Sequence, residues 1–66
     1  MTNSRFLRLP EVLKRISLSK AQIYNLISLG EFPQQIKLGD RASAWVESEI
    51  NQWIDDRIRF SREGEL

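Results

Sequence analysis

The chain has 66 residues, of which 41% are hydrophobic and 29% charged, with a net charge of +1 and no cysteine or histidine. A chain this short buries only about 60% of its unfolded surface, so we expect one domain over residues 1–66, with a small core and no deep enzyme pocket. Without cysteine or histidine there are no disulfides and no thiolate or imidazole ligands. We therefore expect no metal, no cofactor and no small-molecule ligand.

Neither end of the chain has the pattern of a targeting segment. The N-terminal stretch MTNSRFLRLP lacks the apolar run of a signal peptide, and no stretch approaches the roughly 18 apolar residues of a membrane span. We expect a cytoplasmic protein with no membrane contact. The tail SREGEL, residues 61–66, has no apolar period and is expected to fray, which leaves an ordered core over about residues 6–60.

The charges are distributed unevenly along the chain. Residues 1–41 hold seven Lys or Arg residues against three acidic ones, a net charge of +4. Residues 42–66 hold three basic residues against six acidic ones, a net charge of −3. This asymmetry indicates a basic surface from the first half of the chain that faces a polyanion, here called the front, and an acidic surface from the second half, here called the back.

Two short helices are predicted in the first half of the chain. Aliphatic residues at positions 9, 12, 13 and 16 have the spacing of one helix face, and a proline suits the first turn, so we expect a helix over about Pro10–Ile16. After a three-residue break, Ser19 and Gln22 fit a capping box at the start of a second helix that ends at Gly30. Two short helices joined in this way are typical of a helix-turn-helix, whose second helix enters the major groove of DNA.

A hairpin follows the second helix. The residue before Pro33 is extended, the segment QIKL alternates apolar and polar residues, and Gly39, Asp40 and Arg41 supply a turn before SAW. We therefore expect a small hairpin over residues 35–45.

Apolar residues at positions 50, 53, 54 and 58 then predict a third helix over about Glu47–Arg59. Phe32, Trp45 and Trp53 are expected to form an aromatic cluster that joins the hairpin to this helix. The predicted fold is mainly α with a small β-hairpin. Its order of helix, helix, hairpin, helix is that of a compact winged helix-turn-helix.

A family resemblance extends over about residues 6–59. It is carried by three segments together: LRLPEVL, LSKAQIYNLISLGEFPQQIKLGDRASAW and ESEINQWI. The chain resembles the AlpA family of prophage and integrative-element transcriptional regulators, relatives of the MerR-type winged helix and of small phage excisionases. It departs from the family pattern at Ser17, where the family usually has glycine, and at Asn25, where it usually has a basic residue.

The second helix has a polar outer face opposite its aliphatic core face, and no bulky aliphatic side chain lies on it. The candidates for base reading on this face are Ala21, Gln22, Asn25 and Ser28. Ala21 allows close approach to base edges, and the amides of Gln22 and Asn25 match the donor and acceptor pattern of adenine. Two alternatives stay open: Gln22 serving only as the capping partner, and Asn25 as a solvated polar residue.

The candidates for phosphate contact are Ser19, Lys20 and Tyr24 on the helix-turn-helix, Lys37 and Arg41 on the hairpin, and Arg5 and Arg8 in a basic arm ahead of the first helix. Phosphate contacts position a protein on DNA without reading its sequence. Arg41, at the turn tip, can reach a phosphate or the minor groove, and the resembled family also tends to carry a basic residue there. The alternatives are a Tyr24 ring lying over the core edge and ordinary surface charges at Lys37, Arg5 and Arg8.

No nucleotide-binding, nucleophile or metal-ligand motif is present, so we expect no enzyme. The favoured function is a sequence-specific regulator of transcription that binds double-stranded DNA in the nucleoid, with further copies of itself on adjacent half-sites. The resemblance implies control of integrase or excision genes on a mobile element. Two alternatives stay open: an excisionase-like architectural factor that directs site-specific recombination, and a small protein-interaction module that works through its acidic third helix.

Overall fold

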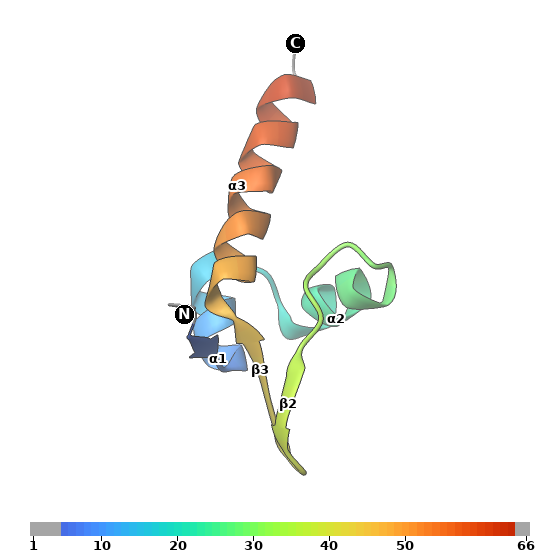
Figure 1. Ribbon diagram of the computed structural model, residues 1–66. Coiled ribbons are helices and arrows are strands. Elements are labelled where there is room, and N and C mark those ends of the chain that lie inside the picture. The colour runs from blue at the N-terminus through green and yellow to red at the C-terminus, as the bar shows by residue number, and fades with distance from the viewer. Residues whose placement is uncertain (1–4, 65–66) are drawn as a thin grey trace.

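The computed structural model describes residues 5–64, which form three helices and a small three-stranded sheet (Figure 1). The elements in chain order are β1 (Phe6–Leu7), α1 (Leu9–Ile16), α2 (Lys20–Ser28), β2 (Ile36–Gly39), β3 (Ala42–Val46) and α3 (Glu47–Gly64). The predicted order of helix, helix, hairpin, helix is confirmed, and the fold is that of a compact winged helix-turn-helix. No helix in the described range is long and apolar enough to cross a membrane.

The antiparallel hairpin β2–β3 is the wing of this fold. Lys37 faces Ser43, and the register shifts between Lys37 and Gly39, which marks a bulge. The turn lies at Asp40 and Arg41, as predicted. All four residues of β2 are exposed, whereas β3 contains the buried residues Ala44 and Trp45. The wing therefore stands clear of the core along β2 and is anchored to the domain through β3.

The short strand β1 was not predicted, because two residues are too few to show a period. It pairs with β3, placing Phe6 opposite Val46 and Leu7 opposite Trp45. The backbone N–H of Glu47 donates to the carbonyl oxygen of Arg5 at 2.7 Å. Arg5 thus leads directly into an edge strand, and β3 lies between β1 and β2. The phosphate contact expected of the Arg5 side chain stays a prediction.

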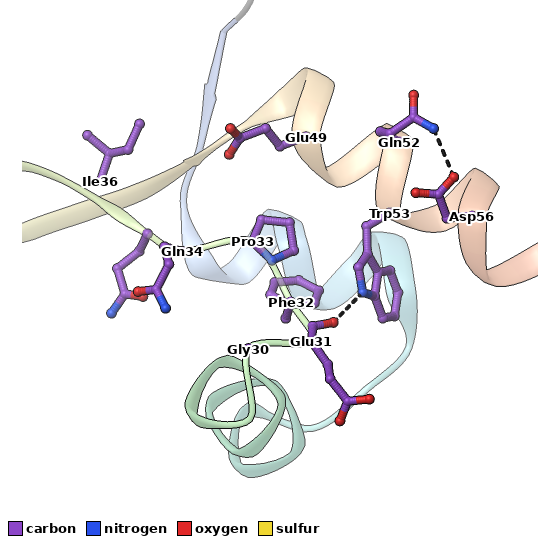
Figure 2. A pocket seen from close by; sticks show the side chains of 11 residues that line it. Gly30, Glu31, Phe32, Pro33, Gln34, Ile36, Glu49, Gln52, Trp53 and Asp56 are labelled. Carbon is purple, nitrogen blue, oxygen red and sulfur yellow. Dashed lines mark hydrogen bonds between the residues drawn. The ribbon is translucent and has the colours of Figure 1, made fainter.

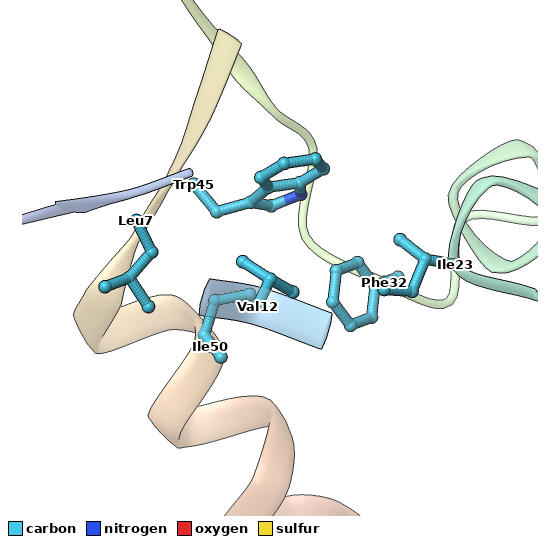
Figure 3. Packing of buried hydrophobic residues seen from close by; sticks show 6 residues of the cluster. All are labelled: Leu7, Val12, Ile23, Phe32, Trp45 and Ile50. Atoms are coloured by element: carbon cyan, nitrogen blue, oxygen red, sulfur yellow. The ribbon is translucent and has the colours of Figure 1, made fainter. Parts of the chain in front are cut away.

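The core is a cluster of six buried side chains, and different parts of the fold contribute one each (Figure 3). They are Leu7 from β1, Val12 from α1, Ile23 from α2, Phe32 from the loop after α2, Trp45 from β3 and Ile50 from α3. Every element except β2 thus reaches the centre through one residue. Half-buried apolar residues, among them Leu26, Ile27 and Trp53, pack around this cluster.

The loop between α2 and β2 is fixed by the two tryptophans. The indole N–H of Trp53 donates to the carbonyl oxygen of Glu31 at 2.8 Å, and that of Trp45 donates to the carbonyl oxygen of Pro33 at 3.0 Å. Between them Phe32 is buried, and its ring meets the Trp53 ring edge-on at a centroid distance of 5.0 Å. The predicted aromatic cluster is confirmed, and its hydrogen bonds supply partners for loop carbonyls that no strand satisfies.

Helix α3 is longer than predicted. It continues past Arg59 to Gly64, so residues 61–64, expected to be part of a frayed tail, belong to the helix, while residues 65 and 66 lie outside the described range. Once a helix is nucleated, each further residue adds one backbone hydrogen bond, so the helix can extend by a turn without an apolar face. Its C-terminal end projects away from the hairpin (Figure 1), and Ile58 and Phe60 there are 45% and 67% exposed.

The turn of the helix-turn-helix contains a strained residue. Ser17, which ends α1, has φ 57° and ψ 30°, and its backbone N–H donates to the carbonyl oxygen of Leu13 at 3.1 Å. A left-handed conformation brings Cβ close to the following carbonyl oxygen and costs a residue other than glycine about 1–2 kcal/mol. The glycine usual in the resembled family therefore has a physical reason at this position.

We predict that Ser17→Gly stabilises the domain. Relief of the left-handed strain exceeds the extra conformational entropy that glycine loses, for a net gain of about 0.5–1 kcal/mol, or a rise in Tm of about 2–8 °C measured by circular dichroism. The matched control is Ser61→Gly within α3, where the same change at a helical position should lower the Tm. A Ser17→Gly variant less stable than the parent protein contradicts the interpretation.

Candidate nucleic-acid interface

Both ends of α2 are defined by the hydrogen bonds that the sequence predicts. The backbone N–H of Ser19 donates to Oε1 of Gln22 at 2.9 Å, and the backbone N–H of Gln22 donates to Oγ of Ser19 at 3.1 Å, which closes the capping box. At the other end Gly30 has φ 74°, the left-handed conformation expected there. Because its carbonyl oxygen already accepts one hydrogen bond in the cap, Gln22 has its amide N–H₂ and a single remaining lone pair of that oxygen to offer to a partner.

The outer face of α2 is open to solvent, since each of its candidate residues is exposed: Lys20, Ala21, Gln22, Tyr24, Asn25 and Ser28. The Ser28 hydroxyl donates to the carbonyl oxygen of Asn25 at 2.7 Å, which leaves that hydroxyl as an acceptor. Within residues 5–64, no hydrogen bond involves the side-chain amide of Asn25. Asn25 thus presents both its donor and its acceptor to an incoming partner.

On the hairpin side of α2, the structure brings three of the predicted phosphate contacts together. Arg8, Tyr24 and Arg41 line one depression of about 420 Å³, although they come from the start of α1, from α2 and from the wing tip. Arg8 is the residue preceding α1, and its side chain makes no capping hydrogen bond. The two guanidinium groups and the phenol hydroxyl around this open depression can all donate hydrogen bonds to an oxyanion.

The opposite flank of α2 faces α3. Gln22 and Asn25 line a second depression, of about 500 Å³, whose wall on the α3 side carries Trp53 and Arg57. The sequence analysis missed Arg57, because it lies in the acid-rich half of the chain and no motif marks it. The signal that could have found it is its place on α3 four residues after Trp53, on the same helix face.

Two of the other basic residues, Arg5 and Arg15, lie beside an acid. Glu47, in the first turn of α3, accepts a hydrogen bond from Arg15 at 3.0 Å and lies 4.0 Å from Nε of Arg5. Lys37 is exposed on the wing, as its predicted role requires. Of the seven basic residues in the first 41, five have no ion pair among the described residues: Lys14 on α1, and the predicted phosphate contacts Arg8, Lys20, Lys37 and Arg41.

A third depression lies between α3 and the loop after α2, away from the outer face of α2 (Figure 2). Its polar lining includes Glu31, Glu49 and Asp56, and the side-chain amide of Gln52 donates to Oδ1 of Asp56 at 2.9 Å. Carboxylates repel phosphates, so this hollow belongs to the acidic back of the molecule. Among the described residues, no group of acidic side chains is arranged to hold a metal ion.

Comparison with known proteins assigns the family. The family model described as "Prophage CP4-57 regulatory protein (AlpA)" matches residues 5–58. Protein ORF88 of Enterobacteria phage P4 is 45% identical over 64 residues, which cover 97% of this chain and 73% of that protein. The DNA-binding transcriptional activator AlpA of Escherichia coli strain K12 is 31% identical over 62 residues, which cover 85% of this chain and 89% of that protein. With these matches and with its winged helix-turn-helix fold, the chain belongs to the AlpA family of prophage regulatory proteins.

Proposed function

We propose that this chain is a sequence-specific regulator of transcription that binds double-stranded DNA in the cytoplasm. Helix α2 lies in the major groove, and the hairpin β2–β3 lies along the adjacent phosphate backbone. The observation that carries the proposal is the outer face of α2. Its candidate residues are all exposed, it has no bulky aliphatic side chain, and it is flanked by the depression that Arg8, Tyr24 and Arg41 line.

Asn25 is the proposed base-reading residue. Its amide is exposed and has no partner within the described residues, so it can form the paired hydrogen bonds that recognise adenine. Ala21, one helical turn earlier, lets the helix approach the bases closely and can contact a thymine methyl group. Gln22 and Ser28 are weaker candidates, because each already spends part of its hydrogen-bonding capacity within α2.

The remaining candidates contact phosphates. Lys20 and Tyr24 lie on α2, Lys37 and Arg41 on the wing, and Arg8 at the start of α1. Ser19 contributes through the helix start that it caps. Arg5 is the weakest member, because its side chain is next to Glu47.

A module this small offers a limited footprint, so we propose that further copies occupy adjacent half-sites. The E. coli relative is described as a transcriptional activator. By analogy, we propose that this chain controls integrase or excision genes of a mobile element. Selection of bound sites from random DNA, mapped onto the host genome, tests this role: sites at a promoter support it, whereas clustered sites at an attachment region indicate an architectural factor of recombination instead.

We predict that DNA affinity depends strongly on salt. If the four cations of the front, Arg8, Lys20, Lys37 and Arg41, each neutralise one phosphate, the slope of log affinity against log salt is about −3 to −4, because counterions are released. The measurement is a fluorescence anisotropy titration of a labelled mixed-sequence duplex at several salt concentrations. A flat response, or no binding to any duplex, contradicts the proposal and favours a protein-interaction module.

We further predict that Asn25→Ala and Arg41→Ala have different effects on specificity. Loss of the Asn25 amide removes about 1–3 kcal/mol of discrimination at one base pair, whereas loss of the Arg41 charge weakens binding to all sequences about equally. Site selection and competition binding with each variant measure both effects. The matched control is Asn51→Ala on α3, which should leave the selected sequences unchanged. An unaltered specificity profile for Asn25→Ala shows that another residue reads the base.

A further inference from the structure

Arg57 is a cation on a rigid support. Its guanidinium carbon lies 5.0 Å from the centre of the Trp53 ring, in the geometry of a cation–π contact. Trp53 is itself fixed by the 2.8 Å hydrogen bond to the carbonyl oxygen of Glu31 and by edge-on contact with Phe32. An arginine positioned in this way loses less conformational entropy on binding an anion than a freely moving side chain.

The charge of Arg57 is not consumed within the domain. Glu31 and Asp56 line a small neighbouring depression with it, yet in the part of the chain that the structure describes no carboxylate comes within ion-pair distance of Arg57. Asp56 instead accepts a hydrogen bond from Gln52. Arg57 is exposed, so its five N–H donors remain available to an external anion.

The position of Arg57 relative to α2 indicates which anion that is. A helix that lies in the major groove has a phosphate backbone on each side of it. On one side of α2 the hairpin brings Arg41 next to Tyr24, and on the other side Arg57 lines the same depression as Gln22 and Asn25. The two flanks of the reading helix thus each carry a guanidinium group supplied by a different element.

We propose that Arg57 binds a phosphate of the DNA backbone on the side of α2 opposite the hairpin, so that the duplex is held from both sides. This inference rests on the proposed function, because it uses the same placement of α2 in the groove. It assigns part of α3 to the binding surface, although the sequence places that helix in the acidic half of the chain. The alternative is that Arg57 only covers Trp53 and stabilises the fold.

The test compares four variants for binding to the mixed-sequence duplex: Arg57→Gln, Arg57→Lys, Arg59→Gln and Arg41→Gln. Arg59 is the matched control, because it lies about 200° from Arg57 around the same helix and has the same charge. Circular dichroism gives the Tm of each variant, and binding is measured well below the lowest of these temperatures. A purely structural role changes the Tm but leaves the salt slope intact.

We expect Arg57→Gln to make the salt slope shallower by about 1 and to weaken binding about eightfold at 0.1 M salt, since one phosphate contact is lost. Arg57→Lys, which keeps the charge, and Arg59→Gln should retain the slope of the parent protein. An unchanged slope for Arg57→Gln, or equal losses for Arg57→Gln and Arg59→Gln, overturns the inference. If Arg41→Gln alone flattens the slope, the proposed function stands without Arg57; if neither variant changes it, the proposed function falls as well.

Discussion

The arrangement of the reading helix and the wing depends on two hydrogen bonds from tryptophan side chains to one loop. The indole N–H groups of Trp53 and Trp45 hold the carbonyl oxygens of Glu31 and Pro33, and Phe32 between them is buried in the core. This loop leaves α2 and enters β2, so its conformation sets the angle between the helix and the hairpin. Because one tryptophan comes from β3 and the other from α3, the loop is hydrogen-bonded to two of the three elements that follow it. The proposed DNA-binding surface consists of α2 and the hairpin, and it requires a fixed angle between them, since phosphate and base contacts must form together.

Because the core is small, the residues on the outer face of α2 can change without disturbing it. Ile23 is the only residue of α2 that is fully buried, and the exposed side chains of the same helix make no contribution to the central cluster. Changes on the outer face, such as asparagine in place of the basic residue usual at position 25, therefore leave packing intact while altering which base edge the helix can match. Basic residues favour guanine, whereas an asparagine amide favours adenine. In the proposed complex, stability and specificity therefore depend on two different faces of this nine-residue helix.

The order of the elements could be predicted from the sequence, because each main element has its own local signal. The capping box at Ser19 and the left-handed Gly30 mark the ends of α2, and both are present in the structure. Strand β1 could not be predicted, since two residues show no period and the strand forms only by pairing with β3, about forty residues away. The predicted end of α3 came too early, because residues 61–64 contain no large apolar side chain and therefore show no apolar period.

The candidate site was predictable in part. The polar face of α2 follows from the helical period, and the wing-tip arginine follows from the turn signal. Three other features of the site depend on tertiary packing. Arg8, Tyr24 and Arg41 line one depression, Glu47 lies beside Arg5 and Arg15, and Arg57 lines the same depression as Asn25. Charge counted along the chain could not separate paired arginines from free ones.

The central claim is that the outer face of α2 and the hairpin together form the DNA-binding surface. The most direct test is NMR of the isotope-labelled protein during titration with duplex DNA, which reports on each residue separately. We expect large shift changes at Ala21, Asn25 and Arg41, and little change at Glu49 and Gln52 in the acidic depression. Changes confined to the acidic side of α3, with α2 unaffected, would contradict the central claim.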